Sequence, residues 1–377
     1  MTENKLVFLT ASEIRFGRGK ACEVAVAAKA FGARVMLVNG LTAARSNWLA
    51  DQLTPVARFS VGHEPDIAMI EAGVAAARAA KAQVIVAMGG GAVIDAGKAI
   101  AALVPARLPM MDHLELVGRG LPLGADPLYF IAVPTTAGTG AEVTKNAVIG
   151  VPSARRKVSL RDNRMLPDVA IIDPALTDGT PKPVTLASGL DAVTQVIEPY
   201  VCTKANRLTD ALCRDAIPLG LAALVRLMET EDTAARDDLA WVSLCGGLAL
   251  ANAGLGAVHG LAGPIGGAAS APHGAVCGAL LPPVLAANAK LATDVAAARI
   301  SEVQNWISHA FGVETEQATT ALQNWSQHHG LPRLSQMGLQ EDELQSIAQD
   351  SLASSSMRGN PVALTERALI DILYAAY

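Results

Sequence analysis

Four polar residues in the second half of the chain have types and spacings that suit a metal site. Asp191 and Gln195 are four residues apart, so on a helix both point from one face toward the same spot. His259 ends an apolar helix-period run, and His273 begins another beyond a Gly- and Pro-rich break. A carboxylate and two imidazoles from three helices can bind Zn²⁺ or Fe²⁺ and leave one position for a substrate. A catalytic metal site is therefore one hypothesis for these residues.

A structural role is the alternative. In a chain with seven histidines, any two can be core or surface residues, and Asp191 could merely charge the first turn of its helix. We expect the remaining histidines, which lie in polar or loop-like segments, at the surface: His63, His113, His309, His328 and His329. Spacing alone leaves both hypotheses open.

A glycine-rich turn in the first half could hold a phosphate. Gly89, Gly90 and Gly91 follow a strand-like run and open a helix-period segment that contains Asp95. Glycines let the backbone approach a pyrophosphate, and N–H groups at a helix start attract anionic oxygens. The order GGGxxxD is not the GxGxxG of the Rossmann fingerprint. The three glycines could also form only a tight strand-to-helix connection.

A second loop strengthens the phosphate hypothesis. Residues 134–140 also follow a strand-like run, and Thr135, Thr136 and Thr139 supply three hydroxyl groups. Two such loops at the ends of neighbouring strands would converge on the crevice where α/β sheets bind ligands. The alternative is a plain turn closed by local hydroxyl-to-backbone bonds.

Strands and helices alternate around these loops. The strand-like runs are 34–39, 83–88 and 129–134, and the helical patterns between them are 21–31, 66–80 and 93–103. The apolar runs 146–151 and 169–173 extend or flank the same sheet. This alternation predicts a mostly parallel sheet that is covered on both faces by helices.

The character of the chain changes after Pro174. From about residue 183 to 377 there is no convincing strand pattern, and long helix-period segments follow one another. The proline-rich stretch 173–183 is the best linker. We therefore predict an α/β dinucleotide-binding domain at residues 1–180 and an all-helical metal- and substrate-binding domain at residues 181–377.

Composition limits the possible partners. The net charge is −5, and no basic run offers a face for nucleic acid. Apolar stretches are broken by charge, Gly or Pro before they could span a bilayer, and residues 1–13 lack the apolar segment of a signal peptide. The five cysteines have no CxxC spacing, which is typical of reduced, buried thiols. We expect a cytoplasmic protein without a nucleic-acid or membrane partner.

Together these segments resemble the iron-containing (group III) alcohol dehydrogenase family, which is similar in fold to glycerol dehydrogenases and dehydroquinate synthases. The landmarks occur in the family's order along nearly the whole chain: residues 89–98, residues 133–144, Lys157, residues 166–174, residues 189–191, residues 272–274 and residues 360–361. In combination they are far more specific than any one of them.

The resemblance implies an NAD- or NADP-dependent alcohol dehydrogenase, or a reductase of aldehydes or ketones. The cofactor-binding residues that it implies are Asn39, Gly40, Gly89, Gly90, Gly91, Asp95, Thr135, Thr136, Thr139 and Lys157, whose ammonium reaches toward the ribose. Asp191, His259 and His273 match three of the family's four metal ligands, and Gln195 stands at the remaining position. Bound Fe²⁺ or Zn²⁺ would polarise the oxygen of a small alcohol or carbonyl substrate. No side-chain acid is obvious, and we expect a homodimer.

Three departures from the family pattern bear on the chemistry. Gln195 replaces a histidine, and an amide oxygen is a weaker ligand than imidazole for these ions. Gly263 stands where a pocket histidine is frequent, which implies a wider pocket. Gly40 stands where many NAD users have an acid that binds the ribose, and Arg45 is near enough in sequence to attract a 2′-phosphate. NAD and NADP therefore both remain open.

Three alternatives compete with this prediction. A metal-independent reductase resembling maleylacetate reductase would keep the fold, although retention of Asp191, His259 and His273 speaks against it. A dehydroquinate-synthase-like lyase would use NAD catalytically, but Thr135, Thr136 and the Asn360–Pro361 segment fit dehydrogenases better. A non-catalytic scaffold is disfavoured by the intact glycine loop.

Overall fold

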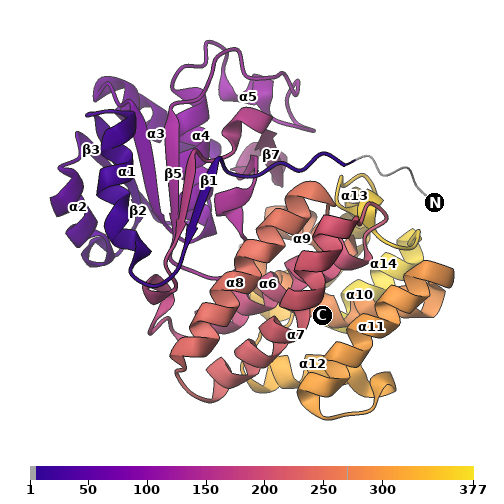
Figure 1. Cartoon of the computed structure of the whole chain (residues 1–377). Helices are drawn as coiled ribbons and strands as arrows, with labels where there is room; N and C mark the ends of the chain where they lie inside the picture. Colours follow the sequence, from indigo (N-terminus) through magenta and orange to yellow (C-terminus); the bar gives the residue numbers. More distant parts are fainter. Residues whose placement is uncertain (1–5, 270) are drawn as a thin grey trace. The chain divides into compact units, whose positions relative to one another are not determined.

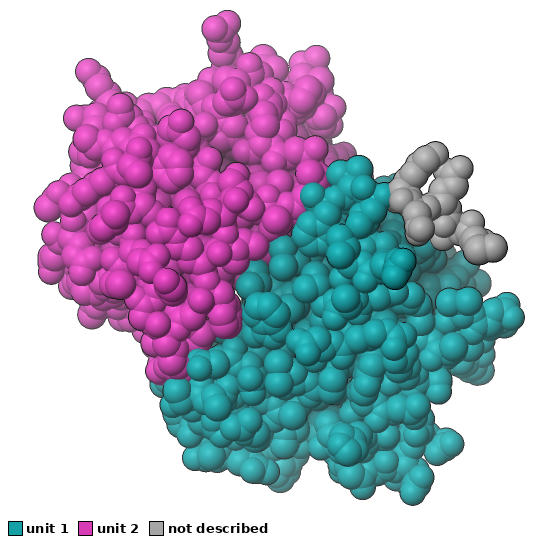
Figure 2. All heavy atoms as spheres, in the orientation of Figure 1, with its two compact units in different colours: residues 1–8, 137–139, 179–377 teal, residues 9–136, 140–178 magenta. Residues whose placement is uncertain are grey.

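The computed structural model describes residues 6–269 and 271–377. They form two compact units, which Figure 2 distinguishes by colour. The α/β unit comprises Leu9–Thr136 and Gly140–Asp178. The helical unit comprises Ala137–Thr139, Gly179–Tyr377 and the described part of residues 1–8. Residues 137–139 therefore belong to the helical unit although the segments on either side belong to the α/β unit, and from residue 179 onward the whole chain belongs to the helical unit.

The main sheet of the α/β unit has six strands in the order β1-β8-β5-β4-β2-β3, and every neighbouring pair is parallel (Figure 1). Its strands are β1 Glu13–Phe16, β2 Val35–Gly40, β3 Ala57–Val61, β4 Val84–Gly89, β5 Tyr129–Pro134 and β8 Val169–Ile172. A separate antiparallel pair is formed by β6 Asn146–Val151 and β7 Arg156–Arg161. Of the two flanking runs predicted from sequence, 169–173 joins the main sheet and 146–151 does not.

Helices cover both faces of this sheet. They are α1 Val24–Phe31, α2 Asn47–Leu53, α3 Ile67–Ala79, α4 Gly91–Leu103 and the short α5 Met110–His113. Successive side chains of a strand point to opposite faces, so each central strand contributes to two cores. In β2, Val35 and Leu37 pack with residues of α1 and α2, whereas Met36 and Val38 pack with residues of α3 and α4. Burial on both faces explains the continuous apolar runs in the sequence.

The helical unit is built around one buried helix. Its helices are α6 Lys182–Val201, α7 Arg207–Glu229, α8 Thr233–Asn252, α9 Ala257–Ala268, α10 His273–Leu291, α11 Asp294–Phe311, α12 Ala318–His328, α13 Leu344–Leu352 and α14 Glu366–Ala376. Helix α6 packs against α7, α8 and α10, and all of its residues from Gly189 to Val201 are buried. No strand occurs within the described parts of residues 179–377. The predicted fold class, an α/β region followed by an all-helical region, is confirmed.

Helix α10 departs from one expectation. Among the described residues it is the one helix that by itself is long and apolar enough to cross a membrane, with a mean hydropathy of 1.3 over 18 of its residues. Slightly more than half of these residues, 56%, are buried inside the protein. The helix also packs against α6, α9, α12 and α14, as a core helix does.

Candidate metal centre and cofactor loops

Three of the four predicted metal-site residues meet inside the helical unit. Asp191 of α6 places its Oδ1 3.5 Å from Nε2 of His259 in α9 and 3.9 Å from Nε2 of His273 in α10. Asp191 is buried, and its Oδ1 has no hydrogen-bond donor among the described residues. A buried carboxylate oxygen without a donor is costly unless a cation lies beside it. These residues therefore fit a bound divalent ion.

Cys277, for which the sequence predicts only a reduced, buried thiol, joins this cluster. Cys277 lies one helical turn after His273 on α10, and its Sγ is 3.6 Å from His273 Nε2 and 3.8 Å from His259 Nε2. The ligand atoms of these residues and Asp191 all lie within 4.8 Å of one another. The signal that could have identified Cys277 is its spacing of four from His273, which puts both side chains on one face.

Glu198, which was also missed, orients His259. One carboxylate oxygen accepts the backbone N–H of Val258 at 2.7 Å, in the first turn of α9, and the other lies 2.6 Å from His259 Nδ1. This contact leaves Nε2 of His259 facing Asp191 and Cys277. A carboxylate that holds the second nitrogen of a histidine fixes its tautomer and ring orientation for metal binding. Glu198 is seven residues after Asp191, hence on the same face of α6.

Glycines allow the helix ends to come this close. A Cβ at Gly274 would lie 2.4 Å from the carbonyl oxygen of Ala187, so a side chain there would force α10 away from α6. A Cβ at Gly256 would lie 2.9 Å from Glu198 Oε1 and 3.0 Å from Asn360 Oδ1. Asn360 in turn accepts the N–H of Ala257 at 3.2 Å. The Asn360 landmark thus helps to hold the start of the helix that contains His259.

Gln195 has a well-defined partner outside the cluster. Its Nε2 donates to the carbonyl oxygen of Gly138 at 2.6 Å, and the N–H of Gly138 donates to Ser243 Oγ at 2.9 Å. These bonds attach residues 137–139 to α6 and α8. Whether Gln195 is a metal ligand stays a prediction.

The two predicted phosphate loops adjoin one another in the α/β unit. Gly90 is the N-cap of α4, and a Cβ there would lie 3.2 Å from Thr136 Oγ1. The N–H of Thr135 donates to the carbonyl oxygen of Gly89 at 2.9 Å. At Gly89 a Cβ would lie 2.4 Å from Val93, so the strand can turn into α4 only without a side chain.

The end of β2 lies beside the glycine loop. Asn39 is in register with Met88 of β4, so Gly40 and Gly89 end adjacent strands. The strand order reverses at this point, because β3 follows β2 on one side and β5 follows β4 on the other. Open α/β sheets bind ligands at such a switch point. Asn39 is buried and donates to the carbonyl oxygen of Gly40 at 2.7 Å.

Three other predicted cofactor residues have structural partners or lie elsewhere. Asp95 Oδ2 accepts the N–H of Val148 at 2.9 Å, which ties α4 to β6. Lys157 forms an ion pair with Glu64. Thr139 belongs to the helical unit, whereas Thr135 and Thr136 belong to the α/β unit. Their roles toward a cofactor stay predictions.

Comparison with known proteins settles the family. Residues 11–174 match the model of the iron-containing alcohol dehydrogenases, and residues 185–377 match the C-terminal model of the same family. The chain belongs to the iron-containing alcohol dehydrogenase family. It is a metal-containing alcohol oxidoreductase.

Relatives of this alcohol dehydrogenase include bacterial enzymes of similar length. It is 35% identical to the probable alcohol dehydrogenase EutG of Salmonella typhimurium, over 83% of this chain and 77% of that protein. It is 32% identical to lactaldehyde reductase of Escherichia coli, over 83% of this chain and 82% of that protein. The crystal structure of a 1,3-propanediol oxidoreductase superimposes with a TM-score of 0.88 at 28% identity, covering 99% of this chain and 100% of that chain.

The two histidines of the metal cluster in this alcohol dehydrogenase have raised pKa values. Burial opposes protonation of both imidazoles, but neighbouring Cys277, Glu198 and Asp191 outweigh it and raise the pKa of His259 well above 6.5. For His273, burial is likewise outweighed by Cys277 and Asp191, and the pKa rises to about 9. Burial would raise the pKa of Asp191, yet the two histidines hold it below its usual value. The cluster therefore attracts positive charge.

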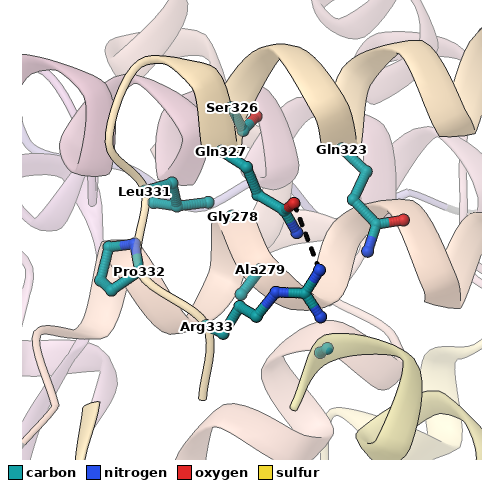
Figure 3. Close-up of a pocket in the computed structure, with 9 residues that line it drawn as sticks. Gly278, Ala279, Gln323, Ser326, Gln327, Leu331, Pro332 and Arg333 are labelled. Carbon is teal, nitrogen blue, oxygen red and sulfur yellow. Dashed lines mark hydrogen bonds between the residues drawn. The ribbon is translucent and has the colours of Figure 1, made fainter. Parts of the chain in front are cut away.

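Two cavities of the dehydrogenase's helical unit lie away from this cluster. Figure 3 shows a small pocket lined by segments of α10 and α12 and by residues 331–333, where Arg333 donates to Gln327 Oε1 at 3.5 Å. A groove of about 440 Å³ is lined by α10, α12 and α14. Neither is lined by a residue of the metal cluster.

His113 corrects a sequence-based expectation. It was expected at the surface, but it is buried at the end of α5, where its Nδ1 lies 2.9 Å from the carbonyl oxygen of Leu121.

Proposed function

We propose that this chain transfers hydride reversibly between a nicotinamide cofactor and the carbinol or carbonyl carbon of a small alcohol, aldehyde or ketone, with a divalent ion held by Asp191, His259 and His273. The observation that carries the proposal is the orphaned Oδ1 of Asp191, which faces two imidazole nitrogens within 4 Å. When bound, Fe²⁺ or Zn²⁺ supplies Lewis-acid polarisation of the substrate oxygen.

The protein's own residues bind the metal ion and the cofactor and orient the groups that hold them. Glu198 holds His259 so that Nε2 points into the cluster. The side chain of His273 is 35% exposed, whereas those of Asp191 and His259 are nearly buried, so His273 marks the accessible side of the cluster. Gly90 and the N–H groups at the start of α4 would receive the cofactor pyrophosphate. No side chain is assigned as the proton donor, and we propose that the proton passes through water or a ribose hydroxyl.

For the cofactor we propose NAD as the first candidate, with NADP also accepted. The NAD-dependent methanol dehydrogenase of Bacillus methanolicus is 28% identical over 95% of this chain, which supports NAD. Gly40 offers no carboxylate to repel a 2′-phosphate, which supports tolerance of NADP.

Turnover measured with and without metal tests this proposal. The chain is dialysed against a chelator and assayed with NAD and NADP across a panel of short alcohols and aldehydes, before and after addition of Fe²⁺ or Zn²⁺. We expect activity to be lost on chelation and restored by one of the ions, and His273→Ala to lose both bound metal and turnover. Full turnover by metal-free wild type would support the metal-independent reductase, with His259 and His273 acting on the substrate.

We further propose that the cofactor binds to residues 1–180 and that residues 181–377 provide the metal and substrate site. The end of the compact α/β unit at Asp178 supports this, although residues 137–139 belong to the helical unit. The described cysteines are all free, which supports a reducing, cytoplasmic location. A homodimer rests on the family resemblance alone, and light scattering tests it.

A further inference from the structure

The strongest unassigned feature is the thiol inside the metal cluster. Cys277 is completely buried, on the face of α10 that also presents His273. Its Sγ faces both imidazole Nε2 atoms, at 3.6 and 3.8 Å. Cys277 belongs to the apolar core of the helical unit, but its Sγ also contacts two imidazole nitrogens, which a cysteine that only fills space does not need.

The separations in the cluster match the spaces between ligands around one ion. Bonds of roughly 2.0 Å to nitrogen or oxygen and 2.3 Å to sulfur, arranged tetrahedrally, put neighbouring ligand atoms about 3.3 to 3.6 Å apart. Four of the six separations among the ligand atoms of Asp191, His259, His273 and Cys277 run from 3.5 to 3.9 Å, and all six are within 4.8 Å. A small adjustment would close them around a metal.

Hydrogen bonding can account for the sulfur contacts of Cys277, but not for the separation between Asp191 and His259. A charged nitrogen–oxygen hydrogen bond is about 2.7 to 2.9 Å long. His259 makes a contact close to this length with Glu198 on its Nδ1 side, at 2.6 Å. On its Nε2 side, Asp191 Oδ1 stays at 3.5 Å. The same ring is thus hydrogen-bonded at one nitrogen and spaced for coordination at the other.

Gln195, the alternative fourth ligand, is already engaged. Its amide N–H holds the carbonyl oxygen of Gly138 at 2.6 Å, so the side chain anchors a backbone segment. Coordination through its oxygen would offer a neutral, weak donor, whereas a thiolate is anionic and soft.

We propose that Cys277, and not Gln195, is the fourth protein ligand, so that the ion is bound by one carboxylate, two imidazoles and one thiolate. This inference rests on the proposed metal site of Asp191, His259 and His273. Soft thiolate favours Zn²⁺, and its analogue Co²⁺, over Fe²⁺. The preferred metal of this chain would then be zinc, although its family is named after iron.

Cobalt spectroscopy tests the thiolate directly and does not depend on activity. The full-length chain is stripped with chelator and loaded with one equivalent of Co²⁺. Wild type should show a thiolate-to-cobalt charge-transfer band in the near ultraviolet, together with the visible bands of tetrahedral Co²⁺. Gln195→Ala should keep the charge-transfer band.

Cysteine variants identify the sulfur. Cys277→Ala should lose the charge-transfer band and bind Zn²⁺ more weakly by on the order of a hundredfold. Cys245→Ala is the matched control, since Cys245 is equally buried in the same apolar core but does not belong to the group of ligand atoms around Asp191, and it should keep both properties. Circular dichroism checks that each variant is folded. If Cys277→Ala does not fold, the wild-type spectrum still shows whether a thiolate binds the cobalt ion.

The outcomes separate this inference from the proposed function. Stoichiometric Co²⁺ binding that His273→Ala abolishes, but without a charge-transfer band in wild type, would overturn the thiolate ligand and leave the metal site standing. Retention of the band in folded Cys277→Ala would overturn it too. Absence of any Co²⁺ or Zn²⁺ binding, with turnover unaffected by chelator, would overturn both.

Discussion

At the scale of single residues, the candidate metal site shows which chemistry can be anticipated from spacing. Asp191, His259 and His273 come together as anticipated, although two of them are far from Asp191 in sequence. Cys277 and Glu198 were missed because a lone cysteine and a mid-helix glutamate are ordinary in isolation. Their roles depend on which other helices they face, and this packing is not visible in the spacing along one helix.

Glu198 leads to the first residue-scale prediction. Its two oxygens accept from two donors, Val258 N–H and His259 Nδ1–H. In Glu198→Gln only one oxygen remains, so one donor must face an amide N–H. We expect metal affinity to fall roughly 10- to 100-fold, because His259 loses its fixed tautomer. Isothermal titration with Zn²⁺ measures this, and NAD affinity should not change. Unaltered metal affinity in the folded variant would show that Glu198 does not position His259.

Glu142 gives a prediction about pH. Burial raises its pKa to about 7, against a backbone hydrogen bond and the charge of Lys98. A raised carboxyl pKa means that its contribution to stability is present below the unfolded value of 4.5 and is lost as pH rises through 7. Glu142→Gln cannot ionise, so it should be more stable than wild type at high pH, by on the order of 3 kcal/mol.

The comparison requires that Lys98 keep its partners in the Glu142 variant. Its Nζ has three oxygen acceptors at 2.7 to 2.9 Å and Asp95 at 3.7 Å, so it does not depend on Glu142. Urea unfolding of both proteins at several pH values measures the difference. If the difference in unfolding free energy between the two proteins is constant from about pH 5 to about pH 8, the pKa of Glu142 is not raised.

At the scale of elements, the central strands and their helices could be predicted, but the edges of the sheet could not. β2, β4 and β5 are buried on both faces, and their sequences are mostly continuous runs of apolar residues. β1 is four residues long, with the charged residues Glu13 and Arg15, and β3 alternates between partly buried and exposed residues. Such short or half-exposed strands depend on their neighbours for their conformation.

The start of α4 yields a prediction for the glycine loop. A valine at Gly90 would push a branched side chain toward Thr136, where the pyrophosphate is proposed to approach. We expect Gly90→Val to weaken NAD binding by more than about tenfold. Fluorescence titration measures it. Gly124→Val is the matched control, because a Cβ at Gly124 meets no atom within 4 Å, and it should bind NAD normally. Unchanged NAD affinity in folded Gly90→Val would show that the pyrophosphate does not bind at this loop.

The carboxyl end of β2 yields a prediction for cofactor choice. A Cβ at Gly40 meets no atom within 4 Å, so Gly40→Asp can be accommodated without displacing a neighbour. Its carboxylate would bond the ribose 2′-OH of NAD and repel the 2′-phosphate of NADP. We expect the ratio of kcat/KM for NAD to that for NADP to rise. A ratio that stays constant would mean that the ribose does not lie at this strand end.

At the scale of the whole molecule, the two units should respond to different ligands. The metal residues belong to the helical unit and the glycine loop to the α/β unit. A ligand that binds only the folded form stabilises what it binds. In hydrogen-exchange mass spectrometry, Zn²⁺ should protect α6, α9 and α10, and NAD should protect the start of α4 and the end of β2. Protection of α4 by Zn²⁺ alone, as strong as that of α6, would contradict this division.

The position of β1 has a consequence for synthesis on the ribosome. β1 leaves the ribosome early, but its partner is β8, with Glu13 in register with Val169, so it waits unpaired until residue 172 has emerged. Meanwhile β2, β4 and β5 can pair through their local crossover connections. Until β8 pairs with it, one edge of β5 has unpaired backbone N–H and C=O groups. Open strand edges in nascent chains recruit one another and aggregate. The yield of folded protein should therefore depend on how quickly β8 arrives.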